Sequence, residues 1–285
     1  MSYHKGTATY VEHAQLKVED LERAVRFYRD MLGFQVLAQS QDRAKLSADG
    51  TRPLLSLVRP ECVTPKQERR AGLYHFALLL PTRSDLARMV THLVRQGIRF
   101  GSADHLVSEA IYFSDPDGNG IEIYSDTDPD TWHWSETGVE MDSVPLDFDD
   151  LLKEGAPQDE SFQLPEKTVI GHLHLHVSYL DEAEEFYTEG LGFEIATRYG
   201  ESALFLSTSR YHHHIALNIW NGVGAPPTPP ESVGLDFFTI VYPDVASRQQ
   251  ALEQLAKLGV TVQKDEEGYL VKDPAGNRME LGVQA

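Results

Sequence analysis

Three side chains suited to acid–base or metal chemistry lie around one turn of the sequence. His105 and Tyr112 precede the turn Asp115-Pro-Asp-Gly118, and Glu122 follows it. The run Gly120–Tyr124 alternates as a strand does, which places Glu122 on the face opposite two isoleucines. A carboxylate that a strand holds inward is costly to bury unless it meets a metal or another cation. Glu122 is therefore a candidate metal ligand that needs partners from elsewhere in the chain.

The elements that must position these side chains occur as an internal repeat. The segment 18–34 recurs at 178–193, and both copies contain Phe-Tyr followed by Leu-Gly-Phe. In each copy, apolar residues at helical spacing end at a glycine, which is typical of a helix C-terminus. An alternating strand precedes each predicted helix, at His13–Val18 in the first copy and at His172–Val177 in the second.

A second kind of unit also occurs twice, over 73–122 and 235–280. Each copy begins with a strand, continues through a helix and closes with Asp-Pro-x-Gly-Asn-x-x-Glu. The pattern predicts an α+β fold of four strand–helix–multistrand modules. We expect two modules in residues 1–130, an acidic linker over 131–168, and two modules in residues 169–285.

Composition excludes several classes of protein. The formal charge of −19 disfavours nucleic acid and anionic lipid as partners. No apolar run approaches the length of a membrane span and no signal peptide is evident, so a cytoplasmic protein is the expectation. The one cysteine, Cys62, excludes an internal disulfide and a cysteine-ligated zinc or iron–sulfur cluster.

The repeated module resembles the vicinal oxygen chelate superfamily, in both its Phe-Tyr-x-x-x-Leu-Gly-Phe helix end and its closing turn. This superfamily includes glyoxalase I, bleomycin-resistance proteins, fosfomycin-resistance enzymes and extradiol dioxygenases. The resemblance covers nearly the whole chain outside the linker. It implies four βαβββ modules paired into two half-open barrel domains, with a divalent metal held inside on strand residues. Since fold does not determine function, the chemistry must be argued from the site.

Three potential ligands stand at matching module positions in the first half of the chain: His13, His75 and Glu122. Two imidazoles and one carboxylate form the facial triad that suits non-haem Fe(II), with Mn(II) or another divalent metal as the alternative. Glyoxalase-like sites use a fourth protein ligand, a Glu near the end of the first module. The matching strand, 54–58, contains no acid, so a four-ligand site is not supported.

The segment around the turn also resembles the signature of extradiol ring-cleaving dioxygenases. That resemblance implies that Tyr112 hydrogen-bonds or helps to deprotonate a catechol oxygen, and that His105 lines the pocket and holds the same oxygen. The alternative is that both are loop and strand residues without a proton role. Such enzymes place one more acid–base histidine late in the preceding module, and the stretch 54–65 contains none.

The second half of the chain leaves two interpretations open. His172, His214 and Glu280 are the members of a potential second triad. The alternative is a degenerate copy of the domain that holds no metal. Phe237 stands at the position of His75, and Leu270 or a neighbour stands at the position of Tyr112.

The resemblance extends to the two-domain catechol-2,3-dioxygenase-like proteins of bacteria, through the segments 72–77, 107–112 and 212–214. It implies an Fe(II)-dependent dioxygenase that cleaves a catechol or hydroquinone with O₂. The alternatives are a lyase, isomerase or thiol transferase with another divalent metal, and a metal-free resistance protein that binds aromatic compounds or drugs. Because the exposed sheet edges of half-barrels are often covered by a partner, a homodimer is a further expectation.

Overall fold

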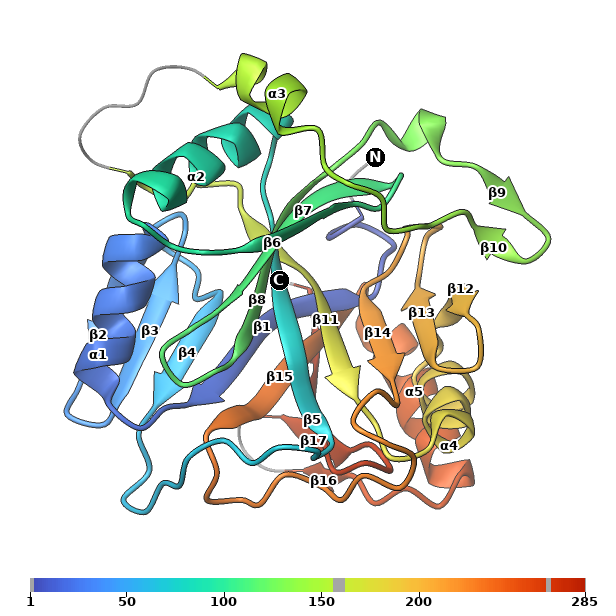
Figure 1. Ribbon diagram of the computed structural model, residues 1–285. Helices are drawn as coiled ribbons and strands as arrows, with labels where there is room; N and C mark the ends of the chain where they lie inside the picture. Colours follow the sequence, from blue (N-terminus) through green and yellow to red (C-terminus); the bar gives the residue numbers. More distant parts are fainter. Residues whose placement is uncertain (1–2, 156–161, 265–267, 285) are drawn as a thin grey trace.

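Two eight-stranded sheets form the body of the protein, and helices cover their outer faces (Figure 1). The computed structural model describes residues 3–155, 162–264 and 268–284. Each sheet contains strands from two modules. We call the sheet of the second and third modules the inner-module sheet, and the sheet of the first and fourth modules the outer-module sheet. The predicted α+β class, with four βαβββ modules paired into two half-open barrels, is confirmed.

The inner-module sheet has the strand order β12-β13-β14-β11-β5-β8-β7-β6. Its strands are β5 (Gly72–Leu79), β6 (Gly101–Asp104), β7 (Ser108–Ser114), β8 (Gly120–Asp126), β11 (Val169–His176), β12 (Glu194–Tyr199), β13 (Ala203–Ser207) and β14 (Ile215–Asn218). Antiparallel pairing of β5 with β11 joins the two modules at its centre.

The outer-module sheet has the order β16-β17-β18-β15-β1-β4-β3-β2. Its strands are β1 (Tyr10–Lys17), β2 (Gln35–Gln39), β3 (Arg43–Ser47), β4 (Leu55–Val58), β15 (Gly234–Tyr242), β16 (Gln263–Lys264), β17 (Tyr269–Lys272) and β18 (Arg278–Val283). Here β1 and β15 form the equivalent central pair. A separate hairpin joins β9 (Trp134–Ser135) to β10 (Gly138–Val139).

The helices follow the first strand of each module. They are α1 (Leu21–Arg26) with its continuation η1 (Phe27–Met31), α2 (Arg83–Arg95), α4 (Leu180–Glu185) with η4 (Phe186–Gly190), and α5 (Val245–Lys257). The short η2 (Pro129–Thr131) lies at the start of the linker, and α3 (Phe148–Leu151) and η3 (Leu152–Glu154) lie within it. The predicted helix at 18–34 forms as α1 and η1, with its apolar stripe in the core. In the described part of the chain, none of the helices has the length and apolar character needed to cross a membrane.

The pairing of modules differs from the expected one. A half-barrel made by the first two modules was predicted, whereas each sheet takes one module from either side of the linker. All four modules offer the same kind of first-strand edge, and strand alternation does not specify which edges will pair. The boundaries 1–130, 131–168 and 169–285 therefore do not delimit the sheets, and as divisions of the sequence they stay a prediction.

The two repeated motifs contact each other. Tyr28, in the Phe-Tyr helix end of the first module, donates a hydrogen bond of 2.8 Å to Asp115 in the closing turn of the second module. Asp115 also accepts hydrogen bonds from the backbone N–H of Asp117 and from the backbone and side-chain nitrogens of Asn119. Tyr187 and Asp273 repeat this contact between the third and fourth modules. The turn that precedes Glu122 is thus tied to the helix of a module in the other sheet.

Replacement of Asp115 by alanine should lower the free energy of unfolding by about 2–5 kcal/mol, because it leaves buried donors without an acceptor. Urea denaturation followed by circular dichroism measures the change. The control is Asp30→Ala, an exposed carboxylate paired with its neighbour Arg29, which should shift stability by no more than about 0.5 kcal/mol. Equal effects of the two substitutions would contradict this account of the turn.

Candidate metal centre

One buried cluster in the inner-module sheet has the composition of a metal site. His75 on β5, Glu122 on β8 and His172 on β11 each offer a ligand atom, and these atoms lie within 4.8 Å of one another. Nε2 of His75 is 2.9 Å from Glu122 Oε2, and Nε2 of His172 is 3.1 Å from the same oxygen. Within the described ranges, the three residues form the single group of this kind.

Strand register brings the three side chains together. Ala77 on β5 pairs with His172 on β11 and also with Glu122 on β8, so the two ligands flank one small side chain. His75 lies two residues earlier on the same strand and therefore on the same face. It pairs with Gly120, where a Cβ atom would come within 2.1 Å of the backbone oxygen of Tyr74. A glycine at 120 is therefore required for the strands to approach as they do.

The electrostatics of the cluster favour a cation. Burial alone would raise the pKa of Glu122, but His172 and His75 outweigh it and hold that pKa well below its usual value. Burial lowers the pKa of His172 to about 4. Nε2 of His75 is buried, and although it lies 2.9 Å from Glu122 Oε2 it is not aligned to form a hydrogen bond with that oxygen. A carboxylate and two imidazoles on adjacent strands, with an unsatisfied ring nitrogen among them, fit a divalent metal of the kind bound by facial triads.

His13 does not belong to this cluster, and its predicted place beside His75 and Glu122 was wrong. It lies on β1 of the outer-module sheet, where its Nε2 is 2.8 Å from Ser56 Oγ and its ring is beside Phe237. The reason is the pairing of the modules: His13 holds in the outer-module sheet the position that His172 holds in the inner one.

The potential second triad is also absent from the structure. His172 is a member of the inner cluster, while Nε2 of His214 lies 2.8 Å from the backbone oxygen of Tyr3. Glu280 accepts a hydrogen bond from Thr239 on the neighbouring strand of the outer-module sheet. The interpretation of the second copy as one without a triad agrees with this geometry.

His105 and Tyr112 are placed together at the edge of the cluster. Tyr112 pairs with Glu122 across β7 and β8, and its ring centroid lies 5.7 Å from that of His75. Its hydroxyl is 2.6 Å from Nε2 of His105. Nδ1 of His105 lies 2.7 Å from the backbone oxygen of Asp142, which can only accept, so Nδ1 carries the proton and Nε2 accepts from Tyr112.

Burial and the neighbouring carboxylate keep Tyr112 in its neutral form. Desolvation is the larger cause and Glu122 the second, and together they raise the pKa of the phenol well above its usual value. The arrangement provides a phenol whose proton already points to an imidazole acceptor.

Sequence reasoning missed a further histidine next to the cluster. The ring of His213 lies 4.0 Å, centroid to centroid, from that of His172. Burial lowers the pKa of His213 well below its usual value, so the ring is neutral. The run 211–214 was noticed in the sequence, but only its His214 was assigned, to a second triad, because the third module was not expected to share a sheet with the second.

A short hydrogen-bond chain sets the tautomer of His213. Nε2 of His212 lies 2.9 Å from the carboxylate of Asp126 and donates to it, which leaves Nδ1 of His212 as an acceptor. Nδ1 of His213 is 2.8 Å from that atom and donates the proton between them. Nε2 of His213 is consequently the ring nitrogen that can accept a proton.

Comparison with known proteins agrees with the fold. A family model described as the Glyoxalase/Bleomycin resistance protein/Dioxygenase superfamily matches residues 10–123 and 169–281. The chain belongs to this superfamily. It is also a homologue, 45% identical over 269 residues, of a catechol-2,3-dioxygenase of Bacillus subtilis (strain 168), and the match covers 93% of this chain and 94% of that protein.

Two solved structures share the fold of this superfamily member at low sequence identity. A putative dioxygenase from Bacillus subtilis aligns with a TM-score of 0.67 and 13% identity, over 98% of this chain and 86% of the other. Glyoxalase I from Zea mays aligns with a TM-score of 0.59 and 15% identity, over 96% of this chain and 92% of the other.

The location of the metal cluster predicts different outcomes for two histidine substitutions. His172→Ala should remove a ligand and leave the purified, untagged protein with little bound divalent metal. His13→Ala should retain the metal, because His13 lies in the other sheet. Elemental analysis of protein whose fold is checked by circular dichroism measures both. Loss of metal in His13→Ala with retention in His172→Ala would contradict this location.

Stability of the metal-free protein should fall on mild acidification. Burial lowers the pKa of His13 and His172 to about 4, whereas a histidine in the unfolded chain has a pKa of about 6.5. Between these values the unfolded state binds more protons, so the free energy of unfolding falls as pH falls from about 6.5 to 4, by roughly 1 kcal/mol per pH unit for each histidine. Denaturation at pH 7, 6 and 5 measures the slope, and a flat profile would contradict it.

Proposed function

We propose that the protein is an Fe(II)-dependent extradiol ring-cleaving dioxygenase that acts on a catechol or hydroquinone with O₂. The observation that carries the proposal is the triad of His75, Glu122 and His172 with the hydrogen-bonded pair Tyr112 and His105 at its edge. The relative that is 45% identical is named a catechol-2,3-dioxygenase, which supports the same reaction class.

The two histidines and one carboxylate of the triad favour iron and its reaction with O₂ over the chemistry of glyoxalase-like sites, which use four protein ligands. Strand β14 borders β11 in the inner-module sheet and reads Ile215-Ala-Leu-Asn218, so it offers no carboxylate as a fourth ligand. When bound by His75, Glu122 and His172, Fe(II) supplies the redox chemistry through which O₂ reacts with an aromatic diol. Mn(II) or another divalent metal is the alternative occupant, and reconstitution with each metal compares them.

Tyr112 and His105 are proposed to take a proton from the substrate. A diol hydroxyl that approaches the Tyr112 oxygen meets a group whose own proton is already directed at Nε2 of His105. Transfer of the substrate proton to Tyr112, with transfer of the tyrosine proton to His105, leaves Tyr112 neutral throughout. This avoids a buried phenolate, which the raised pKa of Tyr112 disfavours.

His213 is proposed as the second acid–base group, the one that the stretch 54–65 lacks. Its ring packs against that of His172 at a tilt of 46°, and its Nε2 is the acceptor nitrogen. A neutral imidazole beside the metal ligands can take a proton on this side of the cluster and return it later in the reaction.

An aromatic wall beside the triad is proposed to hold the substrate ring. The ring of His174 packs against that of His75 at 5.0 Å, and Tyr74 and Trp220 pack against His174 at 5.0 and 5.1 Å. Tyr74 and Trp220 are 40% and 46% exposed, so this wall reaches from the buried cluster to the surface. A flat diol can stack along it as it approaches the triad.

The direct test is anaerobic reconstitution with Fe(II), followed by a diol and O₂. With a catechol or hydroquinone we expect O₂ uptake in step with a yellow ring-opened product, and a lower rate with Mn(II). Iron-loaded protein that consumes no O₂ with any of several diols would refute the proposal. Activity on a hemithioacetal without O₂ uptake would instead support the lyase, isomerase or thiol-transferase alternative.

The two proton-handling groups predict a pattern in variants. Tyr112→Phe and His213→Gln should each lower kcat by about 10²–10⁴-fold while iron content stays unchanged, because neither residue is a ligand. Tyr199→Phe, a change at a mostly exposed tyrosine, is the matched control and should leave kcat as it was. Full activity in both Tyr112→Phe and His213→Gln would contradict the proposed roles of these two residues in proton transfer.

Three expectations from the sequence lie outside the site and remain predictions: a cytoplasmic location, a homodimer, and the absence of nucleic-acid or membrane partners. The acidic net charge supports the last of them.

A further inference from the structure

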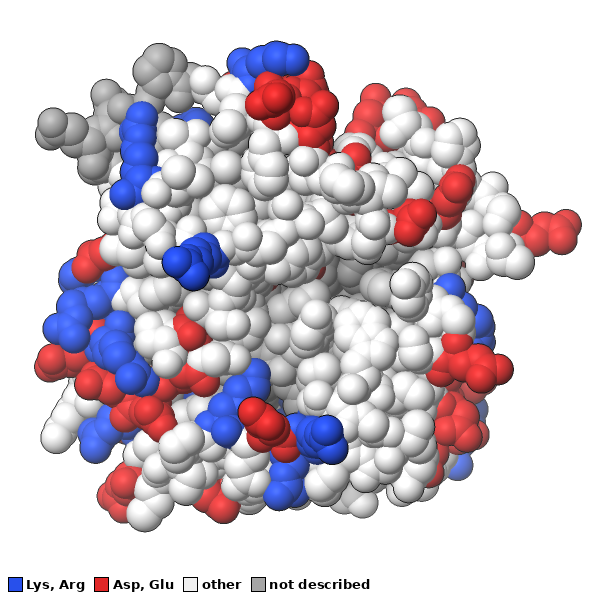
Figure 2. Space-filling view, viewed as in Figure 1, with Lys and Arg blue, Asp and Glu red and all other residues white. Residues whose placement is uncertain are grey.

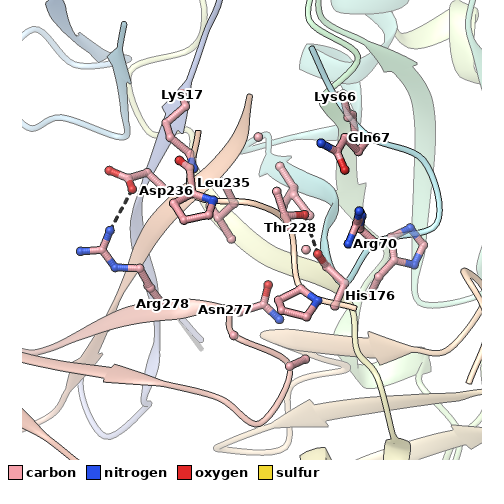
Figure 3. A pocket seen from close by; sticks show the side chains of 18 of the residues that line it. Lys17, Lys66, Gln67, Arg70, His176, Thr228, Leu235, Asp236, Asn277 and Arg278 are labelled. Carbon is pink, nitrogen blue, oxygen red and sulfur yellow. Dashed lines mark hydrogen bonds and ion pairs between the residues drawn. The ribbon is translucent and has the colours of Figure 1, made fainter. Parts of the chain in front are cut away.

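A cavity of about 900 Å³ lies where the ends of the two sheets meet (Figure 3). The first residues of β5 and the last residue of β11 form one wall, together with the loop 66–71. Residues of β1, β15, β17 and β18 form the opposite wall. The triad of His75, Glu122 and His172 does not line this cavity, and neither do His105 and Tyr112.

The described lining of the cavity is cationic although the chain as a whole is acidic. Its six basic residues are Lys17, Lys66, Arg69, Arg70, Lys272 and Arg278, against two acidic residues, Glu68 and Asp236, which gives 6 − 2 = +4. The chain carries −19 overall. Figure 2 shows Lys and Arg side chains gathered with an acidic group at the lower centre of this face, near the lower end of β5 in Figure 1.

Three of these cations are already engaged by the protein. Arg278 pairs with Asp236 at 3.0 Å. Lys17 is buried and donates to the backbone oxygen of Pro230 at 2.7 Å, and Lys66 donates to that of Gly118 at 2.6 Å. Figure 3 shows Lys17, Asp236 and Arg278 together on one wall.

The other three cations have no protein partner in the described structure: the side chains of Arg69, Arg70 and Lys272 make no hydrogen bond or ion pair there. Arg69 has a φ of +56°, a conformation that residues other than glycine adopt rarely, and both Arg69 and its neighbour Arg70 line the cavity. A guanidinium matches the two oxygens of a carboxylate or phosphate. The cavity therefore offers free cationic donors to an oxyanion.

Apolar surface lies beside these donors and limits the kind of anion. Leu73, Val233, Leu235 and Leu270 line the cavity, and so does His176. An inorganic ion would leave this apolar surface in contact with water, whereas an organic anion covers it and gains the free energy of apolar burial. The volume lies within the range of about 300–1,000 Å³ that is usual for small-molecule sites.

We propose that this cavity is a binding site for a small organic carboxylate, separate from the metal centre, with Arg69 and Arg70 as its anion-binding residues. The proposal does not depend on dioxygenase activity. The cavity adjoins the aromatic wall, because His176 packs against Tyr74 at 5.0 Å and Tyr74 against His75 at 4.9 Å. The experiment must therefore separate binding here from binding at the metal cluster.

Isothermal titration calorimetry of the full chain with benzoate tests the proposal, with benzamide as the uncharged analogue and inorganic phosphate as the anion without an apolar body. Benzoate should bind at one site, at least tenfold more tightly than either of the other two, and more weakly as salt rises. No benzoate binding, or equal binding of benzamide, would overturn the proposal. Equal binding of phosphate would overturn the assignment of an organic ligand.

Variants locate the site. The double substitution Arg69→Gln and Arg70→Gln should weaken benzoate binding at least tenfold, whereas Arg95→Gln with Arg99→Gln, the same charge change outside the cavity, should leave it unchanged. Glu122→Gln should retain benzoate binding while it loses metal-dependent activity, so failure here is distinct from failure of the proposed function. Unweakened binding in the cavity variant, or its loss in Glu122→Gln, would refute this site.

Discussion

The antiparallel pairing of β5 with β11 is the interaction on which the site depends. Its register sets His172 opposite Ala77, and the parallel pairing of β5 with β8 sets the same alanine opposite Glu122. A register shift of one residue would move His172 to the other face of the sheet and disperse the cluster. The Asp115 turn, anchored by Tyr28, holds the beginning of β8 in place. Every proposed role near the triad requires this alignment.

The outer-module sheet shows what the same backbone does with other side chains. His13 pairs with Thr239, which pairs with Glu280, in the pattern that His172, Ala77 and Glu122 follow in the inner-module sheet. Phe237 takes the place of His75, and Thr239 donates to Glu280 where the inner sheet has only a methyl group. These two side-chain differences distinguish the cluster in the inner-module sheet from the polar interior of the outer-module sheet. They explain why the described residues contain a single group of this kind.

Local signals in the sequence were sufficient for much of the architecture. Helical spacing, strand alternation and the repeated turn predicted the four modules, and the segment around Asp115 identified His105, Tyr112 and Glu122 as neighbours. The third ligand was not predictable in this way, because it depends on which module edges pair. Because the first two modules were expected to share a sheet, His213 was not predicted beside the site, and His13 was wrongly predicted to belong to it. The cationic cavity escaped prediction because its lining comes from loops and strand ends distant in sequence, which meet only in the folded chain.

The central claim is that one metal site lies between the second and third modules. Crystals of the iron-loaded protein, measured at energies above and below the iron absorption edge, test it most directly through the anomalous difference density. The account predicts one strong peak per chain, within bonding distance of His75, Glu122 and His172, and none beside His13 and Glu280. A peak at His13, or a peak shared by His214 and Glu280, would contradict it.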